Sequence, residues 1–463
     1  MKRIITDKDV LSVDDIKEFI KMYEADYIPK YNTLWAYFQG KNKAILDKKS
    51  PDPNNPDNRT PVPYAKKIIT TFTGYAYRPR YITYKSEDEQ YMNVLQSTFD
   101  DNNEHIKTSM HGRNTGIFGV SYELLYIDGD KTAEPKFAVV DPREIILIYD
   151  NQIEPKKHSA IRYYKTATSD NGDTYDVIVY TKSGTEYYTM KKDRANNIDS
   201  LMLIGAEPNY FDGLPITAYY LGDQIQGLIE PVLPLIDDYD LLISDSMNEF
   251  DRFAHAYMRL VGMSLSGFAN SKEPGAINRA LKLIKRRRIF EQLPEKDAVT
   301  FLTKDIPTDY IRYMSELVRE QIHNQSHVPD LNGSAFKDGV SGVAVQRLMF
   351  DFENVVSTAE AEFDVGLMDR ITLINSILKK TGQPIGDAFD VTISHKRNAP
   401  LNLKEFADTS LTMKQAGFSR WLVADVMPDD VVPNVEQELE RQDEDIESMM
   451  LDVESMPETD EVE

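Results

Sequence analysis

The stretch SHVPDLNGSAFKDGVSGVAVQRLMF, from Ser326 to Phe350, lies between two segments with strong helical periodicity. It contains Gly333, Gly339 and Gly342, and glycine adopts positive φ without the steric strain that other residues meet there. This composition predicts a deformable loop between two rigid helices. Such a loop could be a phosphate cradle, a metal site, a mobile gate or an ordinary surface connection. The neighbouring segments are needed to choose among these functions.

Long helices are expected on both sides of this loop. The helix before it spans about residues 307–327, and the helix after it runs from about Gly342 to Lys380 with apolar residues every three or four positions. Unbroken, the second helix would be about 58 Å long, with Gly366 as the expected bend and Gly382 as the C-cap. Its apolar stripe consists of Leu348, Phe352, Val355, Ala359, Phe363, Leu367, Ile371, Ile374 and Leu378.

A third long helix is predicted from residue 228 to about residue 256. Apolar residues such as Ile236 and Leu242 follow one face, and five acidic residues follow the opposite face. Between this helix and the helix at 307, three short strands and one helix predict a small α/β insert. The acidic residues are Asp238, Asp240, Asp245, Glu249 and Asp251.

The first half of the chain changes its periodicity near Ser121. Helical spacing dominates before this point, with a break near Pro29, and a period of two follows it. Six alternating or apolar segments, separated by turn signals such as IDGDK and SDNGD, predict a meander of antiparallel strands. DPRE, from Asp141 to Glu144, is interpreted as a turn between two of them. Helices and antiparallel strands together predict an α+β fold.

Composition limits the class of protein. The chain has 463 residues, which is too long for one core of ordinary size, and 41% of them are hydrophobic. It contains no cysteine, which excludes disulfides and thiolate metal sites and indicates a reducing compartment. No apolar run reaches the roughly 18 residues that span a bilayer, and the charged N-terminus lacks the apolar core of a signal peptide. We therefore expect no membrane partner.

The net charge of −23 is spread unevenly. Residues 436–463 hold 13 acidic residues and one arginine, a net charge of −12, which predicts a disordered acidic tail. One concentrated basic patch lies at the predicted C-terminal end of the helix in the insert. It is either a solvated helix end, where cations are favoured, or a docking surface for an acidic partner or DNA. The patch consists of Lys282, Lys285, Arg286, Arg287 and Arg288.

The sequence contains no complete catalytic motif. The glycine loop lacks the Lys-Ser/Thr pair of a P-loop, and GVSG is not a nucleophile elbow. His323 and His327 have the spacing of two zinc ligands on a helix, but Asn324 stands where a zinc protease requires glutamate. A polar helix face explains the pair more simply. We predict that the protein is not an enzyme and that it has no catalytic residue, metal or cofactor.

Seven stretches, taken in order, resemble the portal proteins of tailed bacteriophages, in particular those of long, non-contractile-tailed phages of Gram-positive hosts. Together they cover roughly residues 55 to 440. They are NRTPVPYAKKIITTFTGYAYRP from Asn58, GIFGVSYELLYIDGD from Gly116, VDPREIILIYD from Val140, GLPITAYYLGD, PLIDDYDLLISDSMNEFDRFAHAYMRLVG from Pro234, VPDLNGSAFKDGVSGVAVQRLMF, and KRNAPLNLKEFAD from Lys396.

The resemblance implies a division of the chain into the parts of a portal subunit. Residues 1–227 would form the wing, with its helices and β-meander. Residues 228–256 and 307–327 would be the two stem helices, and residues 257–306 the α/β clip. The tunnel loop would span residues 328–341, residues 342–398 would add a long helix and a strand to the wing, and residues 399–463 would form the helical crown and the acidic tail.

The resemblance also implies a function. Twelve copies would form a ring at one capsid vertex, through which double-stranded DNA is packaged and ejected. The partners would be the terminase motor, the head-to-tail connector, and the major capsid and scaffolding proteins, in the virion and, during assembly, in the host cytoplasm. The basic patch would dock a partner at the clip, and the loop would touch DNA. Its candidate residues are Asn332, Gly333, Lys337, Asp338, Gly339 and Ser341.

The charge pattern fits this function on physical grounds. A wall that lets DNA slide must not hold its phosphates, and an acidic wall gains none of the counterion-release energy that makes binding tight. The loop is then interpreted as a mobile gate. Two other classes stay open: a structural or adaptor protein of another ring in the phage particle, and an enzyme whose site forms only in three dimensions.

Overall fold

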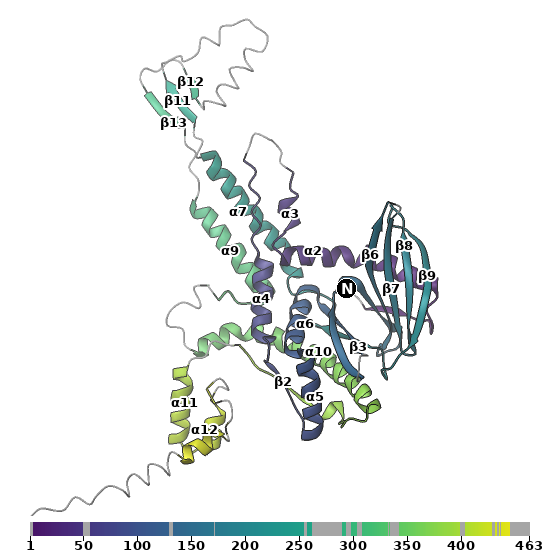
Figure 1. Ribbon diagram of the computed structural model, residues 1–463. Helices are drawn as coiled ribbons and strands as arrows, with labels where there is room; N and C mark the ends of the chain where they lie inside the picture. Colours follow the sequence, from purple (N-terminus) through teal and green to yellow (C-terminus); the bar gives the residue numbers. More distant parts are fainter. Residues whose placement is uncertain are drawn as a thin grey trace, which may run out of the picture. The chain divides into compact units, whose positions relative to one another are not determined.

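The computed structural model describes residues 3–49, 56–128, 133–170, 172–253, 257–261, 289–292, 298–302, 308–331, 333, 342–398, 403–427, 431–432, 435 and 437–444. Helices and mostly antiparallel sheets are combined, so the predicted α+β class is confirmed (Figure 1). The chain divides into two compact units. One comprises residues 1–330 and 351–397, and the other residues 331–350 and 398–463.

Helices dominate the chain before residue 119. Ser12 starts α1 through a capping box, since its hydroxyl accepts from the Asp15 amide (3.3 Å) and the Asp15 carboxylate accepts from the Ser12 amide (2.9 Å). The predicted break at Pro29 is confirmed, because this proline lies in the first turn of the next helix. The helices are α1 (Val13–Asp26), α2 (Ile28–Phe38), α3 (Lys43–Leu46), α4 (Tyr64–Ala76), α5 (Glu89–Asp101) and α6 (Glu104–Phe118).

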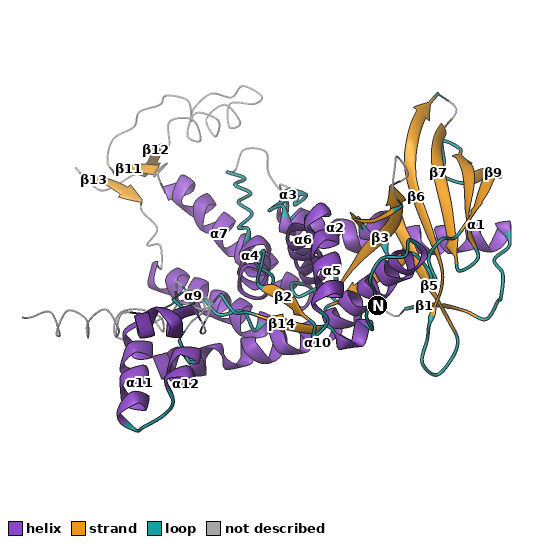
Figure 2. Ribbon diagram, turned by 60° about the horizontal axis from the view of Figure 1, so that its bottom comes forward, coloured by secondary structure: helices purple, strands orange, loops and turns teal. Residues whose placement is uncertain are grey.

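The strands predicted as one meander form two sheets (Figure 2). The division falls at the predicted turn, where the Asp141 carboxylate caps a 3-10 turn at Pro142–Glu144 by accepting from the Arg143 amide (2.9 Å). The three-stranded sheet has the order β10 (Ile216–Tyr220), β3 (Val120–Asp128), β4 (Glu134–Val140). The six-stranded sheet has the order β1 (Ile4–Thr6), β5 (Ile145–Asp150), β6 (Lys157–Ser169), β7 (Gly172–Thr181), β8 (Gly184–Lys192), β9 (Ile198–Pro208).

The later elements that the structure describes follow the predicted order, whereas the helix predicted inside the insert lies outside the described residues. A 3-10 turn at Glu230–Val232 leads into α7 (Leu233–Phe253), so this helix begins five residues later than predicted. The insert contains β11 (Tyr257–Val261), β12 (Ile289–Gln292) and β13 (Ala298–Leu302); β11 pairs with β12 in parallel and with β13 antiparallel. The remaining elements are α9 (Thr308–Ser326), α10 (Gly342–Lys380), the 3-10 turn Ala388–Asp390, β14 (Thr392–His395), which pairs with β2 (Ile82–Lys85), α11 (Leu403–Gln415) and α12 (Arg420–Asp425).

The helix α10 carries much of the core. Phe363 lies between the rings of Tyr77 and Tyr219, at centroid distances of 4.7 and 4.8 Å. Gly366, predicted as a bend, has a packing role within this helix, because a Cβ atom there would lie 2.5 Å from the Tyr219 ring. Gly382 is confirmed as the cap, with φ of 72°.

A buried ion network fastens α10 to the three-stranded sheet. The Arg370 guanidinium is fully buried and donates to both carboxylate oxygens of Glu123 on β3 (2.7 and 2.9 Å) and to Glu104 at the start of α6 (3.0 Å). His111 and the Tyr219 hydroxyl also contact Glu123, at 3.1 and 2.9 Å. Burial alone would raise the pKa of Glu123, but Arg370 and His111 hold it well below its usual range.

Replacing Arg370 with methionine tests this network. The change leaves Glu123 and Glu104 buried without their cation, so the free energy of unfolding should fall by about 3–5 kcal/mol. Thermal denaturation followed by circular dichroism measures the effect. Lys380→Met is the matched control, because it breaks the exposed pair with Asp212 (2.7 Å) and should cost less than about 1 kcal/mol. Equal midpoints for the two variants would contradict a stabilising role for the network.

Candidate functional site

The two helices that precede the glycine loop pack together. The helix α7 contacts α9, and Tyr64 of α4 inserts where they meet. Its ring lies edge-on to Tyr239 of α7 (5.0 Å) and to His323 of α9 (6.0 Å). Ile236 of α7 and Ile322 of α9 are fully buried. The helices that lead into the loop are therefore held in place by residues from the N-terminal part of the chain.

An extended segment, residues 58–62, runs along α7; we call it the strap. Three of its backbone amides donate to side chains on the helix. The Asn58 amide donates to Asn248 (2.7 Å), the Thr60 amide to Ser244 (3.0 Å) and the Val62 amide to Asp240 (2.7 Å). The strap thus satisfies its backbone against a helix instead of a strand.

The spacing of these bonds has a simple cause. Alternate amides of an extended chain point to the same side and lie about 6.6–6.8 Å apart. Positions 240, 244 and 248 of a helix share a face and are about 6 Å apart along the axis. The two repeats nearly match, so three successive bonds form in one register. For all three bonds to form, α7 needs a polar side chain at every fourth position along this face.

The strap corrects the prediction that all five acidic residues of α7 form one face opposite the apolar stripe. Asp240 is fully buried, and it also accepts from the Asn42 side chain (2.5 Å). Burial raises the pKa of Asp240. Asp238, Asp245 and Asp251 are exposed, as predicted. Asp240 was assigned to the exposed acidic face because the sequence does not show that the strap lies on this side of the helix.

Removing one acceptor of the strap should loosen it. Ser244→Ala removes the partly buried hydrogen bond of the Thr60 amide, which should cost about 0.5–1.5 kcal/mol. Hydrogen exchange measured by mass spectrometry on peptides that cover residues 57–62 should become faster. The control is Ser246→Ala, since the Ser246 hydroxyl bonds only within its own helix, to the Leu242 carbonyl (2.7 Å). Equal exchange in the two variants would show that the side chains of α7 do not hold the strap.

The glycine loop starts from a fixed base. After α9 ends at Ser326, His327 adopts positive φ (57°) and turns the chain back on the helix. The His323 ring then bonds the Val328 carbonyl through Nδ1 (2.8 Å), and Lys67 of α4 donates to Asp330 (2.8 Å). Burial lowers the pKa of His323. The two histidines therefore do not share a helix face: His323 is buried and holds the helix end, whereas His327 is exposed.

Most of the candidate loop residues lie beyond this base. Gly333 is described and lies in a bend, directly after the fixed stretch. Asn332, Lys337, Asp338, Gly339 and Ser341 lie outside the described residues. The basic patch, Lys282, Lys285, Arg286, Arg287 and Arg288, also lies outside them, so the predicted roles of these residues stay predictions.

A second anchor holds the chain after β14; we call it the clamp. Arg397 donates to Glu353 (2.9 Å) and Glu360 (2.8 Å) of α10, and Glu353 also accepts from the Tyr75 hydroxyl (2.6 Å). His395 lies 2.7 Å from Asp364 and 3.3 Å from Glu360. Three carboxylates on one side of α10 therefore hold two cations from the segment that leads toward α11.

The clamp predicts a pH dependence. Burial alone would lower the pKa of His395, but its bonds to Asp364 and Glu360 outweigh this effect and raise the pKa to about 9. Because the folded pKa lies above the usual 6.5, the stabilisation is complete below about pH 6.5 and is lost as the pH rises through about 9. Thermal midpoints measured across this range should fall less for His395→Gln than for the unchanged protein.

His105→Gln, a histidine change outside the clamp, is the control for this measurement. It should preserve the full decrease across the alkaline range. A decrease of the same size in His395→Gln would show that the clamp does not contribute to it.

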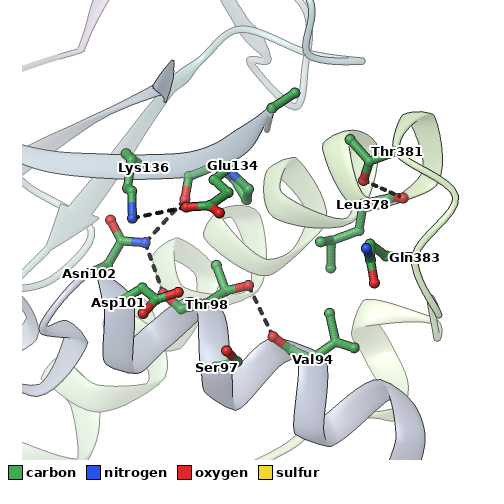
Figure 3. A pocket seen from close by; sticks show the side chains of 12 residues that line it. Val94, Ser97, Thr98, Asp101, Asn102, Glu134, Lys136, Leu378, Thr381 and Gln383 are labelled. Atoms are coloured by element: carbon green, nitrogen blue, oxygen red, sulfur yellow. Dashed lines mark hydrogen bonds and ion pairs between the residues drawn. The ribbon is translucent and has the colours of Figure 1, made fainter. Parts of the chain in front are cut away.

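A cavity of about 390 Å³ opens between α5, the start of β4 and the C-terminal end of α10 (Figure 3). Two of its polar side chains are bonded to its walls: Asn102 donates to the carbonyls of Thr98 (2.8 Å) and Pro135 (3.1 Å), and Lys136 lies 3.5 Å from Glu134. Among the described residues no cluster of histidine and carboxylate side chains could hold a metal ion.

Comparison with known proteins supplies the family. The family described as phage portal protein, SPP1 Gp6-like, matches residues 17–449. The chain belongs to this family. The match covers the strap, both helices before the loop, the loop itself and the clamp.

One curated relative and three solved structures illustrate the similarity. The portal protein of Bacillus phage SPP1 is 21% identical over 340 residues, which are 72% of this chain and 65% of the relative. The virion of a native gene transfer agent (GTA) contains a similar chain, with 9% identity, a TM-score of 0.44 and coverage of 86% of this chain and 98% of that chain. The neck of an empty GTA particle, computed with C6 symmetry, has 10% identity, a TM-score of 0.43 and coverage of 83% and 90%. The neck of a native particle, computed with C12 symmetry, has 10% identity, a TM-score of 0.40 and coverage of 79% and 89%.

The portal family is one of structural proteins, and the predicted family is confirmed. None of the described helices has the length and apolarity that a membrane crossing requires.

Sequence reasoning missed the strap and the clamp. The strap leaves a signal, because Asp240, Ser244 and Asn248 stand four apart and continue the line of the buried Val232 and Ile236. A polar continuation of an apolar stripe indicates a buried polar contact. The clamp leaves no comparable local signal, since its carboxylates and cations are 31–44 residues apart in the sequence.

Proposed function

We propose that this chain assembles into a portal ring at one capsid vertex, through which double-stranded DNA enters during packaging and leaves during ejection. The observation that carries the proposal is the match to the portal family over residues 17–449. The same match makes the runner-up, a ring or adaptor protein of the phage particle that is not a portal, the weaker candidate. We propose twelve copies for the ring.

The parts of the subunit follow from this proposal. The helices α7 and α9 act as the stem, residues 257–306 as the clip and residues 328–341 as the tunnel loop. Residues 1–227 and 342–398 act as the wing, and residues 399–463 as the crown with its tail. The insert fits the clip in one respect, because its three strands form a sheet of their own.

In the channel, the stem would repel rather than hold DNA. Asp238, Asp245 and Asp251 are exposed on α7, and exposed carboxylates gain no counterion-release energy from phosphates. Asp245 has a lysine partner, Lys48, at 3.3 Å, so its charge is partly balanced. Asp240 does not belong to this lining, because it is buried under the strap.

The loop would act as a gate with one fixed end. Lys67 and His323 hold the chain up to Asp330, and the glycines follow directly. Movement would therefore begin at Leu331, and Lys337 beside Asp338 would touch phosphates only weakly. A fixed base lets a loop move without loosening the helix that carries it.

The clip would dock partners from outside the ring. Lys282, Lys285 and the arginines 286–288 would contact the terminase motor or the head-to-tail connector; reversing three of these charges should weaken that binding and leave the ring intact. The wing would contact the major capsid and scaffolding proteins. The ring would assemble in the host cytoplasm and remain in the virion, without an enzymatic activity of its own.

The proposal is tested in two steps. Mass photometry and electron micrographs of the purified protein should show closed rings with a central channel, and a monomer at micromolar concentration in all salt conditions would refute the ring. Ala335→Cys with Asp338→Cys then allows disulfides between loops of neighbouring copies, because the chain has no other cysteine. These bridges should block DNA packaging while the ring persists. Normal packaging with the bridges formed would refute the gate.

A further inference from the structure

The hairpin formed by α11 and α12 is specified by strong local signals. Gly417 ends α11 with φ of 87°, and the Phe418 amide reaches back to the Met413 carbonyl (3.1 Å). Ser419 starts α12, since its hydroxyl accepts from the Leu422 amide (3.3 Å). The turn between the two helices is therefore defined by the residues within it.

This hairpin has almost no core of its own. Between residues 406 and 427, Ala424 is the one buried residue. Leu411, Phe418 and Trp421 are 55%, 53% and 49% exposed. Helices of 13 and 6 residues are too short to be stable alone in water, where helices need a packed apolar face.

The polar contacts of the hairpin do not replace a core. Arg420 pairs with Asp443 at 2.6 Å, but both side chains are largely exposed, and such pairs contribute less than about 1 kcal/mol. The Ser410 hydroxyl contacts the Met427 sulfur at 3.0 Å, which is a weak bond. Apolar burial against something outside the described residues of this hairpin is needed.

The charge of the hairpin indicates what covers it. Residues 403–425 contain three basic and three acidic side chains and are neutral, whereas the whole chain has a net charge of −23 and residues 436–463 have −12. An acidic partner such as DNA would be repelled by the acidic segment that follows. A second hairpin is itself neutral and apolar, and a ring places identical hairpins side by side at high local concentration, which favours their contact although each copy also carries its own acidic segment.

We infer that the α11–α12 hairpin is an interaction surface for a second copy of itself, in which Leu411, Phe418 and Trp421 pack against the hairpin of the neighbouring subunit. This inference rests on the proposed ring. Each hairpin completes its core from its neighbours, so the helices are stable only in the assembled protein. The acidic tails repel one another in the same ring, and salt strengthens the contact by screening that repulsion.

Trp421 reports on this contact directly. The chain has two tryptophans, Trp35 and Trp421, so the fluorescence of the full-length ring minus that of the Trp421→Phe ring isolates the signal of Trp421. In rings, acrylamide should quench Trp421 at least about twofold less efficiently than free N-acetyltryptophanamide, because neighbouring side chains exclude water and quencher from a packed contact. Added salt should lower the quenching further.

Phe418→Glu, compared with Ile153→Glu at a fully exposed loop position, shows whether the shielding comes from the hairpin. Phe418→Glu should restore the quenching of Trp421 while mass photometry still shows rings, and Ile153→Glu should change neither. Rings in which Trp421 is quenched like the free indole would overturn the inference and leave the proposed function standing. A protein that forms no rings at all would overturn the proposed function, and this inference with it.

Discussion

The pair of Arg370 and Glu123 is the interaction on which the larger unit depends. It joins α10 to β3, and through Glu104, His111 and Tyr219 it reaches α6 and β10. A fully buried guanidinium is costly unless carboxylates surround it, so the elements that supply them cannot separate without exposing a bare charge to an apolar interior. The network adds specificity of position to the apolar packing of Phe363 and its neighbours.

Polar side-chain contacts also fix two segments to helices at places where no sheet is involved. The strap offers amides to a polar line on α7, and the clamp offers two cations to three carboxylates on α10. In both places a segment outside the helices and strands is bonded to side chains on one face of a helix. Under the proposed function DNA would pass the glycine loop, and segments fixed to the flanking helices would keep the subunit folded while it does. The base of the loop at Lys67 and Asp330 follows this pattern, because the anchored residues end where the glycines begin.

Under the proposed function, the acidic surface of α7 and the neutral hairpin of α11 and α12 have opposite roles. Exposed carboxylates on α7 keep DNA from binding, whereas the neutral hairpin of α11 and α12 lets identical copies approach each other. Under this proposal, acidic residues lie on the helix that must not bind DNA, and the segment that contacts a neighbouring subunit has no net charge. The buried Asp240 belongs to neither group, and its role is to hold the strap.

The sequence alone determined the periodic elements and the family. The long helices around the loop, the change of period near Ser121, the turn at Asp141 and the cap at Gly382 depend on residues close together in the chain, and the portal resemblance rests on the order of such stretches. Only the tertiary structure showed which strands share a sheet and that Asp240 and His323 are buried. It also showed that the Tyr219 ring leaves no room for a side chain at position 366. Those features depend on residues such as Tyr219, Val62 and Val328, brought close by folding. Except at the helix end held by Val328, the partners are far away in the sequence, and no local periodicity encodes such contacts.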